Sequence, residues 1–499
     1  MTSFGRFIFC LAAAGACLSW GGILGGLTSR MHEFQLGNGM RFVVLERHHY
    51  PQVSAWMFVL AGEMDEGEGQ RGVAGLMDNV FLMGTEITGS RSPASEKAAL
   101  AVVERAMDRL DAEKKRSSDE FSLGRETAET EVKIALDQAR QWESDTFRQM
   151  SAANGMSRVR VDTRMDSTGF GWTMPSERAE VWFKLLGEWL GKPSFRGFYR
   201  VRDAEARKEN PAAASGGSDV DWMAMFRREA FPDSPYGRPS GQLGSLRARG
   251  VEQYFRERYR ASRMAVALVG DITPGQARQW AERYFGSLPA EQEMEARPAA
   301  RVKTGAYREN MNAMLSAVGY RRPPHGHVDD LYFDLLTSLL AGGTTPSYLT
   351  EMKVERQVAQ NTLVAGNYPG DRLESLFVLA AAPAPGRTTG QVEAATIEIA
   401  EKFSKEPLEA GRLAAAVNRI QVEFLLALQS NEAASVRLAR AVGMGGTVKG
   451  IEQEFDRLQS VSPAEFQKFA QQYLKPENRF VFALGPNAME KAPGEGGQQ

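Results

Sequence analysis

The residues of this sequence that could do chemistry begin with its five histidines. His48 and His49 are adjacent, and His325 and His327 form an H-x-H pair just before the acidic pair Asp329-Asp330. Imidazole and carboxylate groups at such short spacing can bind a transition metal or exchange protons near neutral pH. Both groups stand in stretches typical of a polar turn and a proline-rich loop, where histidines are usually solvated. We therefore expect no functional metal site at either place.

Nucleophilic and phosphate-binding chemistry lack their usual sequence signals. There is no G-x-S-x-G turn of the kind that presents a catalytic serine. The glycine pair Gly342-Gly343 follows a predicted helix and has no lysine after it, unlike a phosphate-binding loop, and the glycines from Gly443 to Gly450 read as a loop between helices. Cys10 and Cys17 both lie in the first apolar segment, so neither a cysteine catalyst nor an internal disulfide is expected in the fold.

The composition describes a large globular protein with a balanced surface. The 499 residues include 60 basic and 62 acidic side chains, for a formal net charge of -2. This balance, without a polybasic tail, argues against a nucleic-acid partner. The length predicts two or more domains, and no apolar run after the first segment is long enough to cross a bilayer.

The first apolar segment, Phe7 to Leu27, follows the short start Met1 to Arg6 and predicts an export signal within residues 1–31. Ala14-Gly15-Ala16 offers small residues for cleavage, while Cys17 directly after it could instead be lipidated. An N-terminal anchor and a misassigned start are the alternatives. We expect an exported protein, periplasmic or anchored to the membrane facing the periplasm, with membrane contact only through this anchor or a lipid.

The first half begins with a pattern of strand, strand and helix. Apolar and β-branched runs at Met40 to Leu45 and Val53 to Leu60 read as paired strands. Gly72 to Met83 then carries apolar residues at helical spacing, and Gly84-Thr85 ends it. These elements are expected to form the front of an α+β domain.

A long charged segment, Glu96 to Arg148, follows and carries two narrow apolar stripes at helical spacing. The stripes comprise Leu100, Val103, Met107 and Leu110, and then Val132, Leu136 and Ala139. Two helices joined near Ser117-Ser118 would pack the stripes together as a hairpin that stands off the main body. We expect this insertion to span 93–150 and to lie outside the domain core. A single solvated helix is the alternative.

An internal repeat indicates duplication of one unit. Gln253 to Tyr259 followed by Met264 to Gly270 resembles Phe466 to Tyr473 followed by Phe480 to Gly485, each a helix, a polar link, a buried strand and a glycine. The strand and helix of the front also recur, at Met311 to Tyr320 and Leu331 to Leu340. Pro289 to Arg301 is a plausible linker. We expect domains at 32–290 and 302–486 and a flexible tail at 487–499.

Together these residues resemble the insulinase/pitrilysin type of zinc metallopeptidases, which includes the mitochondrial processing peptidases. The resemblance covers nearly all of the chain after residue 32. Its landmarks, in order, are Leu36 to Met40, Gly72 to Thr85, Pro235 to Pro239, Val269 to Ile272, Tyr284 to Pro289, Gly319-Tyr320, Leu340 to Leu349 and Glu351 to Ala359. The fold that this implies is two homologous α+β domains, each a mixed sheet covered by helices, closing as a clamshell around a chamber.

Active members of this type carry an inverted zinc motif, H-x-x-E-H, on the helix after Gly-Val-Ala. Two imidazoles bind the metal and the glutamate polarises the attacking water. The corresponding residues here are Gly75, Asp78 and Asn79. Alignment on Arg202-Asp203 places Lys208 at the third ligand, and a protonated lysine cannot bind zinc. We expect Lys208 and Asp78 to form an ion pair in the space of the missing metal.

The residues that grip substrate in active relatives are altered as well. Their Asn-x-x-Thr-x-x-Asp motif is on the strand that lines the cleft, expected here around Arg160 to Thr173, and corresponds to Arg160, Thr163 and Asp166. The asparagine is therefore lost, and Thr163 and Asp166 remain as candidate substrate-binding residues. The arginine and tyrosine that stabilise the oxyanion correspond to Lys353 and Gln360.

The sequence therefore predicts a degenerate, non-catalytic member of this type. The resemblance implies a subunit that shapes a peptide-binding chamber in a heterodimer with an active, zinc-binding paralogue, and that needs no cofactor itself. One alternative is an active zinc metalloendopeptidase with non-standard ligands, the only case in which zinc is expected. Another is a self-associating scaffold or peptide-binding module.

Overall fold

The computed structural model describes residues 26, 28–116, 122–157, 159–208, 221–239, 241, 243–290, 301–342 and 347–486, and of Asp78, Val80 and Leu82 the backbone alone. The predicted export signal, the tail at 487–499, most of the predicted linker and the proposed helix junction at Ser117-Ser118 lie outside these residues.

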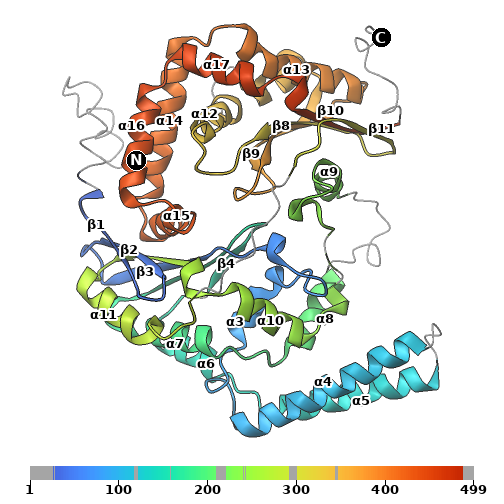
Figure 1. Ribbon diagram of the computed structural model, residues 1–499, viewed down its shortest axis with the longest axis vertical. Coiled ribbons are helices and arrows are strands. Elements are labelled where there is room, and N and C mark those ends of the chain that lie inside the picture. Colours follow the sequence, from blue (N-terminus) through green and yellow to red (C-terminus); the bar gives the residue numbers. More distant parts are fainter. Residues whose placement is uncertain are drawn as a thin grey trace.

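Two mixed sheets organise the described chain (Figure 1). The first has the strand order β1-β2-β6-β3-β5-β4 and the second has the order β7-β11-β8-β10-β9. The strands of the first are β1 (Met31–Gln35), β2 (Arg41–Glu46), β3 (Gln52–Val59), β4 (Arg160–Thr163), β5 (Thr168–Pro175) and β6 (Met264–Gly270). Those of the second are β7 (Gly305–Asn310), β8 (Leu315–Arg322), β9 (Ala359–Tyr368), β10 (Ser375–Pro383) and β11 (Arg479–Gly485).

Without β1, the two sheets correspond strand by strand. In each, the outermost of the corresponding strands is parallel to its neighbour, β2 to β6 and β7 to β11, and the remaining pairs are antiparallel. The predicted repeat has a helix, a short link and a strand in each half. In the first these are α10 (Ala248–Arg258), η7 (Ala261–Arg263) and β6, and in the second they are α17 (Pro463–Tyr473), η9 (Pro476–Asn478) and β11. The predicted α+β fold with two similar halves is confirmed.

Two details of the strand prediction are wrong. β2 and β3 are not paired, because β6, which arrives from more than two hundred residues later, lies between them. The stretch around Arg160 to Thr173 is not one strand but the hairpin β4–β5, which turns at residues 164–167. The helix expected over Gly72 to Met83 is divided into a 3-10 turn, η2 (Ala74–Leu76), and α3 (Met77–Leu82).

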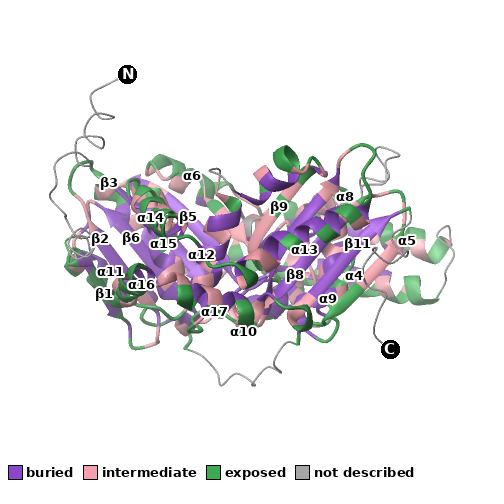
Figure 2. Cartoon of the chain, turned by 90° about the horizontal axis from the view of Figure 1, so that it is seen from above, coloured by how far each residue is buried: buried purple, intermediate pink, exposed green. Residues whose placement is uncertain are grey.

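Helices cover the sheets, and the buried residues concentrate in the strands between them (Figure 2). The helices of the first half are α3, α4 (Pro93–Arg116), α5 (Leu123–Arg140), α6 (Thr146–Ala153), α7 (Ala179–Gly191), α8 (Phe198–Lys208), α9 (Trp222–Ala230), α10 (Ala248–Arg258) and α11 (Pro274–Phe285). Those of the second are α12 (Asp330–Ala341), α13 (Thr389–Lys405), α14 (Ala410–Ala427), α15 (Asn431–Gly443), α16 (Val448–Ser460) and α17 (Pro463–Tyr473). Within the described residues, no helix is long and apolar enough to span a membrane.

The two halves exchange helices. α15 of the second half packs on β2, β3 and β6 of the first sheet, where Leu438 and Val442 join a cluster with Trp56 and Phe58. α9 of the first half packs on the second sheet, where the ring of Phe226 lies 5.6 Å from that of Phe482. Apolar side chains therefore fill both contacts between the halves.

The predicted helical hairpin is present as α4 and α5, which project from the body together (Figure 1). Its base, however, belongs to the core of the first half, contrary to expectation. Val103, Met107 and Val132 are buried in the same cluster as the first sheet. Arg196 explains the attachment, because its buried guanidinium binds the buried carboxylate of Glu96 at 2.8 Å and donates to backbone carbonyls next to α3.

Candidate functional site

A pocket of about 280 Å³ brings together two of the positions that the sequence resemblance aligns with zinc ligands. Gly75, in η2, and Lys208, at the end of α8, both line it. The other lining residues are Glu63, Glu66, Gly72, Leu76, Glu205, Gly241 and Leu243. Gly75 leaves the pocket open, since nothing lies within 4 Å of the position that a Cβ would take there.

Glu66 fixes the backbone that borders this pocket. Its carboxylate oxygens accept hydrogen bonds from the backbone N–H groups of Gly72 and Ala74, each at 2.8 Å. The side chain is buried, and this burial raises the pKa of Glu66 from 4.5 to about 7, against the lowering effect of the two N–H groups. Sequence reasoning missed Glu66, although the acidic cluster Glu63, Asp65 and Glu66 directly after a strand was a visible signal.

The pocket does not fit a zinc ion. The ammonium of Lys208 lies 2.7 Å from a carboxylate oxygen of Glu205, so the nearest carboxylate is already paired with a cation. The expected partner of Lys208 was Asp78, whose side chain lies outside the described residues. All five histidines are elsewhere, in β1, in the loop between β2 and β3, and in the loop before α12. Zinc prefers imidazole and thiolate, and this lining supplies neither.

Thr163 and Asp166 lie at the end of β4, in different surroundings. The hydroxyl of half-buried Thr163 donates to the carbonyl of Ala74, at 3.3 Å, which places the end of β4 beside the pocket. Asp166 is buried, and its carboxylate accepts hydrogen bonds from the backbone N–H groups of Asp371 and Arg372, in the turn between β9 and β10. Asp166 therefore joins the two halves.

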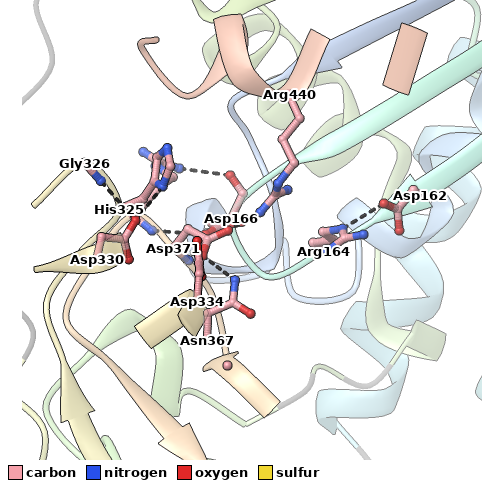
Figure 3. A network of polar contacts seen from close by, with 12 residues as sticks. Asp162, Arg164, Asp166, His325, Gly326, Asp330, Asp334, Asn367, Asp371 and Arg440 are labelled. Carbon is pink, nitrogen blue, oxygen red and sulfur yellow. Dashed lines mark hydrogen bonds and ion pairs between the residues drawn. The ribbon is translucent and has the colours of Figure 1, made fainter. Parts of the chain in front are cut away.

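Other side chains secure the same turn. The hydroxyl of Tyr236 accepts from the backbone N–H groups of Arg372 and Leu373, each at 3.1 Å. The guanidinium of Arg372 binds the fully buried carboxylate of Asp65 at 2.7 Å. The equivalent turns of the two sheets, 164–167 and 369–374, thus lie against each other where the two halves meet (Figure 3).

His325 also lies at this junction (Figure 3). Its Nδ1 is 2.9 Å from Asp330, a hydrogen bond that raises the pKa of His325, and its backbone N–H donates to the carbonyl of Asp371 at 2.8 Å. Arg440 of α15 pairs with the carboxylate of Asp371. His48, of the adjacent pair His48-His49, lies elsewhere. One of its ring nitrogens is 2.6 Å from the carboxylate of Glu46, and the other is 2.6 Å from that of Asp271.

Lys353 and Gln360 lie in the second half, apart from the pocket. Lys353 is an exposed residue of a π-helical turn (Thr350–Glu355), and Gln360 is an exposed residue of β9. Neither lines the pocket at Gly75 within the described part of the chain. The structure therefore gathers Gly75 and Lys208 with Glu205, and leaves the two presumed oxyanion positions on another surface.

β4 is the last strand at one edge of the first sheet, and no other strand of the described residues pairs with its outer side. Its turn closes with a hydrogen bond from the N–H of Arg164 to the carbonyl of Ser167. Along a strand of an antiparallel pair, the backbone N–H and C=O groups of one residue point toward the partner strand and those of the next residue point away from it. The backbone of Arg164 bonds across the turn toward β5. By this alternation the N–H and C=O groups of Thr163 and Val161 point away from β5. These groups could pair with an additional extended segment, with its side chains next to the pocket.

Comparisons with known proteins agree with this architecture. Residues 246–420 match the family described as the peptidase M16 inactive domain. A protease from Helicobacter pylori has a similar structure, with a TM-score of 0.70 and 15% identity over 91% of this chain and 99% of that one. A peptidase M16 inactive domain from Pseudomonas fluorescens gives a TM-score of 0.68 and 14% identity, over 92% of this chain and 98% of that one.

The periplasmic protease PqqL from Escherichia coli is longer. It matches with a TM-score of 0.63 and 15% identity over 93% of this chain, which spans 48% of PqqL. No curated protein sequence matches the chain. At such low identities the solved structures establish the fold alone. The family match adds evidence from the sequence, for residues 246–420. Residues 246–420 thus match the peptidase M16 inactive-domain family, and the chain as a whole has the fold of these M16-type structures.

Proposed function

We propose that this chain is a non-catalytic M16-type subunit that binds extended peptides along the edge of β4, beside the pocket at Gly75. The observation that carries the proposal is the lining of that pocket. Gly75 and Lys208 take the place of two ligands, and Lys208 is paired with Glu205 at 2.7 Å. The edge of β4 still offers its outward backbone groups to a peptide, while the described lining of the pocket supplies no imidazole or thiolate to hold a metal that would activate water.

The subunit would act with an active, zinc-binding paralogue, and the peptide chamber would form between the two chains. Support comes from the exchange of helices, since apolar clusters fill the contacts between the two halves of this chain. Space for a substrate is then more readily provided by a second chain than by opening this one. The apolar segment Phe7 to Leu27 supports export, and the similar PqqL is a periplasmic protease.

Peptide binding is tested at Val161, whose outward N–H is the donor that an added strand would use. Val161→Pro removes this donor without removing a hydrogen bond to β5. We expect it to weaken binding of an unstructured, fluorescently labelled casein peptide by about two- to tenfold in anisotropy titrations, the loss of one backbone hydrogen bond. Val161→Ala keeps the donor and is the matched control. Equal binding by both variants would exclude the β4 edge.

The absence of catalysis is tested separately on the purified chain. We expect mass spectrometry of metals to give no stoichiometric zinc, and the same peptide to stay intact during prolonged incubation. Zinc near one atom per chain together with cleavage that a chelator stops would instead establish an active peptidase with non-standard ligands.

A further inference from the structure

The hairpin of α4 and α5 has two different sides. Its inner side lines a groove of about 790 Å³ together with α8 and α10, and apolar residues such as Leu100 and Leu136 form part of that lining. Its outer side carries a second depression, of about 370 Å³. The helical positions that line the two are on opposite faces of each helix, so the outer side faces away from the body.

The outer depression has the geometry of a helix-packing site. On α4 its lining residues are Val102, Arg105, Ala106 and Arg109, and on α5 they are Glu131, Ile134, Ala135 and Gln138. Each set has the spacing i, i+3, i+4, i+7, which forms the four-residue hole that receives one side chain of a facing helix. Alanine at i+4 keeps each hole deep. Val102 and Ile134 are 39% and 52% exposed and can act as the inserted side chains.

The lining residues of α4 and of α5 lie at matching heights along the hairpin. Arg109 binds Glu131 across the hairpin at 2.8 Å, which fixes these residues at one height. Three residues along each antiparallel helix, about 4.5 Å at 1.5 Å per residue, bring Ala106 level with Ile134. Ile134 of one hairpin would therefore lie over the α4 hole of a second hairpin that is related by a two-fold axis parallel to the helices.

The charges on the outer side of the hairpin are complementary to those of a second copy of the chain. With that axis, α4 of one copy lies on α5 of the other, so that Arg105 and Arg109 face Glu131 and Gln138. Arg105 and Gln138 have no hydrogen bond or ion pair within the described residues. Such an interface is self-complementary, as two-fold symmetry requires, and the bodies lie on opposite sides of the bundle. An axis perpendicular to the helices would instead place arginine on arginine.

We propose that two copies of this chain associate through the outer sides of their hairpins and form a four-helix bundle. The interface lies on different elements from the pocket at Gly75 and the edge of β4. The homodimer therefore does not depend on the proposed peptide binding, and either proposal can fail alone.

Sedimentation equilibrium of the purified full chain tests the dimer. Ile134→Arg places a third cation between Arg105 and Arg109 of the other copy at the centre of the interface, and we expect it to raise the dimer dissociation constant by at least about 30-fold, as for a central interface residue. Leu426→Arg, equally exposed at 52% but on α14, is the matched control and should leave the constant unchanged. A wild-type chain that stays monomeric up to about 100 µM, or association that survives Ile134→Arg, would overturn the proposal.

The charge register has its own test. Arg109→Glu puts like charges together both within a hairpin and between copies, and should weaken the dimer. Adding Glu131→Arg exchanges the two charges and should restore association to within about threefold of wild type, since both contacts are again of opposite sign. Circular dichroism melts of all variants establish that the chains are folded. A double variant as weak as the single one would show that the two-fold axis is wrong.

Discussion

Among single residues, Glu66 has the clearest consequence, because its pKa is raised to about 7 by burial near the candidate site. The folded state then binds more protons than the unfolded state between about pH 4.5 and 7. Stability therefore falls as pH rises through this window, by about 3 kcal/mol at 1.36 kcal/mol per pKa unit. Glu66→Gln cannot titrate and should lose most of this dependence, although it weakens one hydrogen bond to the backbone. Urea unfolding at about pH 5 and about pH 8 measures the difference. A wild-type chain of equal stability at both values would contradict the raised pKa.

Repair of the zinc site is a second prediction for single residues. Gly75→His, Asp78→Glu and Asn79→His together should bind zinc poorly, because the Lys208 ammonium stays in the pocket and occupies Glu205. Adding Lys208→Glu removes the cation and should strengthen zinc binding by at least about tenfold, the range of one altered ligand or supporting group. Competition with a chromophoric chelator measures both affinities. Equal affinities would make Glu205 alone the third ligand.

Site residues were predicted from the sequence only in part. The resemblance to the zinc peptidases aligned Gly75 and Lys208 with two ligands of one site, and both residues line one pocket. The partner of Lys208 is a neighbour on its own helix, Glu205, which ordinary i, i+3 spacing favours. The role of Asp166 could not be foreseen, because its partners lie 205 and 206 residues away and are backbone groups, which leave no signal in side-chain type.

In the hairpin of α4 and α5, the helices could be predicted from the sequence, but their attachment to the body could not. Its two stripes follow from spacing along α4 and α5, so the sequence predicted both helices. The anchor is the pair of Arg196 with Glu96, residues 100 positions apart, and no local pattern joins them. A replacement of the whole segment from Glu96 to Arg148 would leave the buried charge of Arg196 unpaired. Such a replacement is therefore expected to destabilise the first half, contrary to the prediction from sequence.

Removal of one partner of this ion pair gives the third prediction. Arg196→Met leaves Glu96 buried without its cation and should lower the free energy of unfolding by about 3–5 kcal/mol. Arg196→Met with Glu96→Leu removes both charges and should recover much of the loss. Guanidinium unfolding of the two variants checks this. As a control, Arg249→Met breaks an exposed pair with Asp108 and should cost at most about 1 kcal/mol. Comparable losses at Arg196 and Arg249 would show that the base of the hairpin is not anchored by the pair.

For the whole molecule, the duplication was visible in the sequence but the exchange of helices was not. A helix that covers another unit's sheet has the same amphipathic pattern as one that covers its own, and only the tertiary structure decides between them. The separation of β2 from β3 by β6 escaped prediction for a similar reason. Parallel pairing with a strand from far along the chain depends on topology and not on local spacing.

The exchange can be tested at Gly443, the last residue of α15. A Cβ there would lie 2.0 Å from the ring of buried Phe58, so alanine cannot be accommodated unless α15 moves away from the first sheet. Gly443→Ala should destabilise the protein by about 1–3 kcal/mol, the usual cost of overpacking, despite the better helix propensity of alanine. Gly411→Ala, in α14, is the matched control, because the nearest atom to the Cβ position there is 3.5 Å away, an ordinary contact. A differential scanning calorimetry trace unchanged by Gly443→Ala would show that α15 is not tightly seated.

The exchanged helices also make each half depend on the other for its solubility. Without α15, the first sheet would expose the apolar face formed by Trp56, Phe58 and their neighbours, and without α9 the second sheet would expose part of its own. Residues 26–290 and 301–486, expressed as separate polypeptides, should therefore be insoluble alone and soluble when expressed together. Two pieces that each fold and stay soluble alone would show that neither half needs the exchanged helix.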